Sequence, residues 1–186
     1  AFKRVTETPT PATGAAFAWG GLAQAAEQTK DWANAAAAYD KSLGFEPDNS
    51  LYACGAGRGY MMLQKWPEAV DRLERCDRLL EVLAAKPEQP PWLKSARYDT
   101  TFALATCRVQ RGDYSAANKG FESLLAANPQ DARVQNNLAD SLLREGKDAK
   151  RALELATKAA AGKSAVPQVT HTLGWAHLAN KQFDRA

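Results

Sequence analysis

The sequence predicts an all-α fold built from a repeated pair of antiparallel helices, and three observations support this prediction. Residues of the same kind recur at the same spacing, since Ala35-x-x-x-Tyr39 returns further along as Ala117-x-x-x-Phe121. Short turn signals interrupt helix-forming stretches along the chain. The 186 residues are 45% hydrophobic, rich in alanine and leucine, and carry a formal charge of only +3, which indicates an ordered, helix-rich protein.

The first copy of the repeat is the most complete. It runs from about Ala16 to Asp48 and carries, in order, Trp19, Leu22, Ala35, Tyr39 and Pro47. A Trp-x-x-Leu-Gly-x-x-Tyr segment followed by Ala-x-x-x-Phe and then proline, on a period of about 34 residues, is the signature of the tetratricopeptide repeat. The chain therefore resembles this family over most of its length, with Ala23 and Ala26 in the places of the motif glycine and tyrosine. The resemblance implies a right-handed α-solenoid of antiparallel helix pairs.

We expect five copies of the repeat after an extended, Thr/Pro-rich lead-in, residues 1–14, in which Pro9 and Pro11 block a helix. The repeat array would occupy residues 15–186, with copies at about 16–49, 50–85, 91–131, 132–165 and 167–186. The fifth copy stops at Ala186, where its second helix should begin. We therefore expect the chain to be part of a longer protein.

Each motif residue has a packing role in this interpretation. Where the two helices of a repeat cross closely, small residues let the backbones approach while large residues fill the space between them. The small residues are Ala23, Gly57, Ala105, Ala139 and Gly174, and the large ones are Trp19, Tyr39, Tyr60 and Phe121. The run Gly55-Ala56-Gly57-Arg58-Gly59 lacks the spacing of a dinucleotide-binding loop, and we attribute it to close helix packing.

The period of the repeat is broken once. The motif of the second copy begins at about Ser50 and that of the third at about Tyr98. This interval is 48 residues, whereas the usual period is about 34. A leucine pattern carries one helix onward to about Ala85, the proline-rich segment 86–91 forces a turn, and Trp92 begins a long next helix. We expect a long-helix insertion around residues 80–97 that forms a protruding hairpin. The alternative is an insertion that the array tolerates without any role.

The cysteines and histidines form no recognisable framework. Cys54, Cys76 and Cys107 are an odd number without a C-x-x-C pair, so we expect small buried thiols and neither a zinc site nor a set of disulfides. Unpaired thiols would favour a reducing compartment, although the sequence leaves a single disulfide open. His171 and His177 are six residues apart, whereas two metal ligands on one helix face need a spacing of three or four. We expect no metal and no other cofactor.

Signals of catalysis, membrane insertion and nucleic-acid binding are weak. Gly162-Lys163-Ser164 resembles the end of a phosphate-binding loop, but Thr157 stands where that loop needs a glycine. No hydrolase, metalloprotease or calcium-loop motif occurs, so we expect no enzymatic activity. No apolar run of about 18 residues predicts a membrane span. The 24 basic and 21 acidic residues are interleaved along the helices, which argues against a nucleic-acid partner.

The resemblance also implies a binding surface, because the first helix of each repeat lines the concave side of the solenoid in this family. The first-helix residues that point away from the packing face are our candidate partner-binding residues: Gln24, Arg58, Met61, Met62, Phe102, Arg133, Asn136, Asp140, Arg144, His171 and Trp175. Cys54, Asp99 and Gln168 share these faces.

This lining has a mixed chemistry. The methionines and Phe102 would form an adaptable apolar floor, the arginines would hold carboxylates, and Asn136 would pair with a peptide backbone. The alternative is that these side chains only meet water or neighbouring repeats. The clamp with which chaperone-tail readers of this family bind acidic peptides is absent, since Gly20 and Gly55 occupy two of its places.

The sequence thus predicts a non-catalytic scaffold for protein–protein interactions, which binds a partner peptide or helix in the concave groove. Two alternatives stay open: part of a bacterial envelope scaffold for secretion or polysaccharide export, or a substrate-docking arm fused to an enzyme domain outside this chain. Residues 172–176 and the alanine-rich repeats look like those of bacterial arrays. The compartment, cytoplasmic or bacterial envelope, is not resolved. We expect the truncated fifth repeat to favour self-association through an apolar face.

Overall fold

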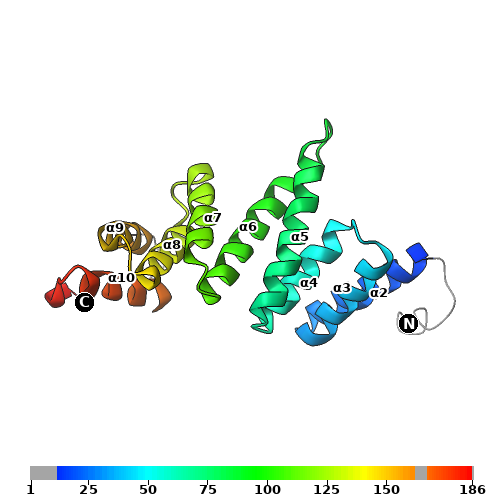
Figure 1. Ribbon diagram of the computed structural model, residues 1–186, viewed down its shortest axis with the longest axis horizontal. Helices are drawn as coiled ribbons and strands as arrows, with labels where there is room; N and C mark the ends of the chain where they lie inside the picture. The colour runs from blue at the N-terminus through cyan, green and yellow to red at the C-terminus, as the bar shows by residue number, and fades with distance from the viewer. Residues whose placement is uncertain (1–11, 162–166, 186) are drawn as a thin grey trace. The chain divides into compact units, whose positions relative to one another are not determined.

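The computed structural model describes residues 12–161 and 167–185. Over these residues the chain forms nine α-helices, one short 3₁₀ helix and no strand (Figure 1). The helices are α2 (Ala12–Gln28), α3 (Trp32–Phe45), α4 (Ser50–Met62), α5 (Trp66–Ala84), α6 (Leu93–Gln110), α7 (Tyr114–Ala127), α8 (Ala132–Glu145), α9 (Ala149–Ala160), α10 (Pro167–Ala179) and the 3₁₀ helix η1 (Phe183–Arg185). The all-α prediction is confirmed. The extended lead-in was predicted three residues too long, since α2 begins at Ala12 and makes residues 12–14 helical. The rest of it, residues 1–11, lies outside the described part.

The chain divides into two compact units, residues 1–107 and 108–186, and the division falls inside α6. In the first unit α2 packs against α3, α3 against α4, and α4 against α5, so that sequence neighbours are also neighbours in space (Figure 1). In the second unit α7 packs against α8, α8 against α9, and α10 against both α8 and α9. None of the described helices is both long and apolar enough to cross a membrane.

Large side chains fill the space that glycines leave between the helices of the first unit. Tyr39 of α3 is fully buried, and a Cβ atom added at Gly55 of α4 would lie only 2.4 Å from its ring. A Cβ atom at Gly57 would lie 2.7 Å from the side chain of Leu73 on α5. Both distances are too short for real atoms, so only glycine permits this approach of the helices. Helix packing therefore explains the glycine-rich run, as predicted.

In the second unit Phe121 of α7 is the fully buried aromatic residue, and α8 lies beside it with an apolar face. Val134 and Leu138 on that face are fully buried, and their spacing of four residues is that of an amphipathic helix. The N-cap of α8 is Asp131, whose carboxylate accepts hydrogen bonds from the backbone N–H groups of Arg133 at 2.9 Å and Val134 at 3.1 Å. These contacts fix the helix that carries several candidate binding residues.

One kind of turn ends the first helix of each pair. The central residue of each turn has a left-handed backbone, with φ between +57° and +80°. Along the chain these central residues are Lys30, Gln64, Gly112, Gly146 and Lys181. The following N–H group donates each time to the carbonyl oxygen five residues before it, which is the bond of a Schellman motif. Successive turns are 34, 48, 34 and 35 residues apart. The backbone therefore repeats with the period of the sequence motif, except across α5 and α6.

Helices α5 and α6, with 19 and 18 residues, are the longest of the described helices. The segment between them contains Pro87, Pro90 and Pro91, and the Gln89 side-chain amide donates to the carbonyl oxygen of Ala84 at 2.6 Å. Proline lacks the N–H group that would continue a helix, so the chain reverses here. Two long helices thus flank the proline-rich turn, and their facing apolar residues form a buried cluster.

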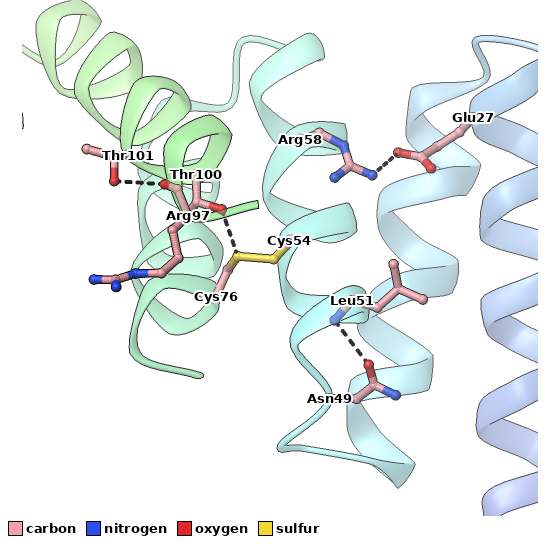
Figure 2. Close-up of a disulfide and its surroundings, with 9 residues drawn as sticks. All are labelled: Glu27, Asn49, Leu51, Cys54, Arg58, Cys76, Arg97, Thr100 and Thr101. Carbon is pink, nitrogen blue, oxygen red and sulfur yellow. Dashed lines mark hydrogen bonds and ion pairs between the residues drawn. A yellow bond between two sulfur atoms is a disulfide. The ribbon is translucent and has the colours of Figure 1, made fainter. Parts of the chain in front are cut away.

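The prediction of three buried thiols is wrong for two of the cysteines. Cys54 of α4 and Cys76 of α5 form a disulfide, with 5.0 Å between their Cα atoms (Figure 2). They are 22 residues apart, and the close packing of the two helices brings them within bonding range. Cys107 is the buried free thiol that we expected, and burial raises its pKa to about 12. The argument for a reducing compartment loses its basis.

Gly112→Ala should lower the free energy of unfolding by about 1 kcal/mol, because the left-handed backbone conformation at this position is strained for alanine. Nothing lies within 4 Å of the added Cβ atom, so backbone strain is the expected cause. Urea unfolding measures the effect. The matched control is Gly44→Ala inside α3, where the added atom also meets open space and alanine should stabilise the helix by up to about 1 kcal/mol. Equal effects of the two substitutions would contradict the assignment of the turn.

Reduction of the disulfide should lower the free energy of unfolding by about 3 kcal/mol, because the bond closes a loop of 22 residues in the unfolded chain. The measurement is urea unfolding with and without a phosphine reductant. A Cys54→Ser, Cys76→Ser variant should not respond to the reductant, whereas Cys107→Ala should respond as the parent does. An unchanged unfolding curve, together with three titratable thiols in the reduced denatured chain, would contradict the prediction.

Candidate functional site

Two open pockets lie along the helices that carry the candidate residues, one within each unit. The first, here the α4–α6 pocket, has a volume of about 230 Å³ and is lined by Cys54, Arg58, Leu73, Trp92, Ser95, Ala96, Asp99, Thr100 and Ala103. The second, here the α8–α10 pocket, has a volume of about 470 Å³ and is lined by Asn136, Asn137, Asp140, Arg144, Pro167, Gln168, His171 and Thr172.

The α8–α10 pocket brings together four of the candidate residues. Asn136, Asp140 and Arg144 are spaced four residues apart, which places them on one face of α8. His171 reaches the same pocket from α10. The opposite face of α8 carries the buried apolar residues, so packing decides which side chains are left to line the pocket.

Asn136 is the most unusual residue of this pocket. Its side chain is only 9% exposed, and its Oδ1 atom has no hydrogen-bond partner among the described residues. A buried oxygen without a partner costs on the order of 1–3 kcal/mol, so folding alone gives no reason for an amide here. An asparagine side chain can donate from its NH₂ group and accept at its oxygen, as both groups of a peptide unit require. The wall of the pocket thus contains an amide whose buried oxygen has no partner among the described residues.

Two other buried side-chain oxygens, on Asn118 and Ser141, also lack partners among the described residues. Neither residue lines the α8–α10 pocket. Among the described residues, Asn136 is the one of these three that lines the α4–α6 or the α8–α10 pocket.

The charges of the α8–α10 pocket are largely balanced. The Arg144 Nε atom donates to the Asp140 carboxylate at 2.7 Å, an ion pair between successive turns of α8. Asn137 donates its side-chain amide to the carbonyl oxygen of Arg133 at 2.8 Å. His171 is exposed on α10. The lining is therefore polar with little net charge, a chemistry suited to hydrogen bonding with an uncharged polar ligand.

In the first unit, Arg58 was predicted to bind a carboxylate of the partner, but it already forms an ion pair within the chain. Its guanidinium group lies 3.0 Å from Glu27 of α2. Figure 2 marks this ion pair with a dashed line. The other oxygen of Glu27 accepts a 2.7 Å hydrogen bond from the Tyr39 hydroxyl. Burial of this hydroxyl, followed by its hydrogen bond to Glu27, raises the pKa of Tyr39 well above its usual value. Arg58 thus ties α4 to α2, in line with the alternative that groove residues meet neighbouring repeats.

The remaining candidate residues line neither pocket: Gln24, Met61, Met62, Phe102, Arg133 and Trp175. Gln24, Arg133 and Met62 are exposed, and Met62 is 50% accessible. Met61 packs instead against the buried cluster that α5 and α6 form. Phe102 and Trp175 are partly buried.

Sequence reasoning missed part of the α4–α6 pocket. Trp92, Ser95, Ala96 and Thr100 line it, although none was among our candidate residues. The one available signal was Trp92, an aromatic residue directly after a proline-rich turn, but the register of a helix after an insertion does not follow from the repeat.

No three histidine, cysteine, aspartate or glutamate side chains gather into a metal site within residues 12–161 and 167–185. Gly162-Lys163-Ser164, which we did not expect to bind a nucleotide, lies outside the described residues.

Several solved structures have a similar architecture. A crystal structure of MamA matches with a TM-score of 0.73 and 17% identity, covering 91% of this chain and 84% of that one. MamA from Desulfovibrio magneticus RS-1 gives a TM-score of 0.73 and 15% identity, covering 91% and 87% of the two chains. YrrB, whose structure is titled as a TPR protein with an unusual peptide-binding site, gives a TM-score of 0.71 and 19% identity, covering 98% and 84%. No curated protein sequence matches the chain. At these identities the likeness shows the fold alone.

A family model supplies the sequence evidence. The model of the tetratricopeptide repeat matches residues 4–50 and 102–168, which together are more than half of the chain. The helix pairs, their common turn and the small-against-large packing agree with this match. The predicted fold class, an all-α helical-repeat solenoid, is thereby confirmed. The chain belongs to the tetratricopeptide repeat family.

Proposed function

We propose that this chain is a non-catalytic scaffold for protein–protein interactions, and that it binds an extended partner peptide through side chains of its first helices that line the pockets. The family supports the general part of this proposal, a scaffold for partner proteins. No observation on the described residues favours the envelope-export or enzyme-docking alternatives over it.

The side-chain amide of Asn136 carries the specific part of the proposal. Rotation of the Asn136 amide would turn its buried Oδ1 atom toward the α8–α10 pocket, where a partner peptide would supply the N–H group that this atom lacks, while the Asn136 NH₂ group would donate to a backbone carbonyl. Such a contact would recognise the partner's backbone, and other residues of the chain would contact the partner's side chains. Gln168 and His171, which line the α10 side of the pocket, would contact those side chains.

Asn136→Leu tests this proposal, because leucine is similar in size and removes the unsatisfied oxygen. We expect the free energy of unfolding to stay the same or rise by about 1 kcal/mol, and the affinity for a bound peptide to fall about tenfold. The probe is a fluorescein-labelled peptide selected against the parent chain from a random displayed library, measured by fluorescence anisotropy.

The matched control is Ser141→Ala, which removes another buried unsatisfied oxygen that does not line the pocket. This variant should gain similar stability and bind the peptide as the parent does. Unchanged binding by Asn136→Leu, or equal losses in both variants, would refute the role of Asn136.

We also propose self-association through the C-terminal end of the second unit, where Leu178 and Phe183 are 48% and 70% exposed. A Leu178→Ser, Phe183→Ser variant should then sediment as a smaller species than the parent at the same concentration. Phe17→Ser is the control, since Phe17 is 71% exposed but belongs to the first unit. A monomeric parent chain, or dissociation by the control alone, would contradict this proposal.

A further inference from the structure

We propose that the α4–α6 pocket binds a basic side chain, lysine or arginine, of a partner polypeptide, with Asp99 pairing the cation and Trp92 packing against it. The inference rests on the proposed function for its polypeptide partner. It concerns a different pocket, in the first unit, and a different chemistry from that of Asn136.

The first observation is an unpaired carboxylate. Asp99 is exposed on α6 and lines the pocket, and no ion pair joins it to another described residue. One helical turn before it stand Ser95 and Ala96, and one turn after it stands Ala103. Its helix neighbours on this face therefore supply no cation. Asp99 offers a full negative charge to whatever enters.

The second observation is an aromatic ring at the same pocket. Trp92 lies just before α6 and is 50% exposed, which is unusual for so large an apolar side chain. The face of an indole ring attracts cations, and it also covers the methylene groups of lysine or arginine. Seven residues separate Trp92 from Asp99, which is two turns or about 10 Å along a helix. A long basic side chain spans most of this distance.

The third observation is the apolar part of the pocket lining. Leu73, Ala96, Ala103 and the half-buried Cys54 line the pocket together with the small polar residues Ser95 and Thr100. The Thr100 hydroxyl lies 3.2 Å from the Cys76 sulfur, and the disulfide holds α4 to α5 at this place (Figure 2). A methylene chain gains free energy on such a surface, whereas a compact anion does not.

Arg58, the one cation among the described residues that line the pocket, does not oppose this proposal. Arg58 is paired with Glu27 at 3.0 Å, and the Tyr39 hydroxyl holds that carboxylate from its other oxygen. The charge of Arg58 is thus balanced, while the charge of Asp99 is not. An acidic ligand would have to compete with Glu27 and would meet Asp99, so charge complementarity favours a basic one.

The experiment is an NMR titration of the full chain with a capped pentapeptide, four alanines around a central arginine. The indole N–H signal of Trp92, assigned with Trp92→Phe, should shift on titration and give a dissociation constant in the millimolar range. Asp99→Asn should weaken binding about fivefold, and so should replacing arginine by its neutral analogue citrulline. Trp92→Ala, followed on other pocket signals, should weaken binding about threefold.

Asp48→Asn is the matched control, because it removes one exposed negative charge of the same unit that does not line the pocket. It should leave the affinity unchanged. The proposal is overturned if the Trp92 signal does not respond, if Asp48→Asn and Asp99→Asn weaken binding equally, or if a peptide with central glutamate binds more tightly. If Asp99→Asn has no effect while Asn136→Leu still weakens the selected peptide, this inference fails and the proposed function stands.

Discussion

The close approach of neighbouring helices is the constraint on which the rest of this structure depends. Position 55 must be glycine because a Cβ atom there would clash with the ring of Tyr39. In the same way, a Cβ atom at Gly20 would clash with the ring of Tyr52. Once Tyr39 is buried, its hydroxyl needs an acceptor, and Glu27 provides one at 2.7 Å. The same carboxylate then holds Arg58. A packing requirement in the core thus extends to charged residues at the surface.

A second carboxylate of the first unit is used in the same way. Asp40 accepts hydrogen bonds from the Tyr60 hydroxyl at 2.5 Å and from the Arg72 Nε atom at 2.7 Å. Burial and the hydrogen bond to Asp40 raise the pKa of Tyr60 to about 12, so the tyrosine stays a donor at any physiological pH. Each of these acids joins one tyrosine and one arginine from neighbouring helices. Such residues belong to the architecture, and a side chain without an internal partner stands out against them.

The features that sequence predicted well are those that each repeat determines locally. The burial of Tyr39 and Phe121 and the place of each turn follow from residues within one helix pair. Lys30 takes the left-handed conformation that Gly112 takes in another repeat, so helix packing fixes the turn even where glycine is missing. The disulfide and the Arg58–Glu27 pair depend on how one helix lies against another, since their partners are 22 and 31 residues apart. A single sequence carries no direct record of that register, and the pocket beside Trp92 depends on it as well.

The ion pairs also bear on the class of partner. The arginines that line the two pockets, Arg58 and Arg144, each already contact a carboxylate of the chain. An acidic peptide would exchange one carboxylate for another and gain little, because exposed ion pairs contribute only about 0.2–1 kcal/mol. Within the described part of the chain, the Asn136 Oδ1 atom has no hydrogen-bond partner and Asp99 has no ion pair, so a ligand would have no internal contact to replace there. If the chain binds peptides as proposed, its selectivity would come from the groups that folding leaves unpaired, and it would favour peptides with basic side chains over acidic ones.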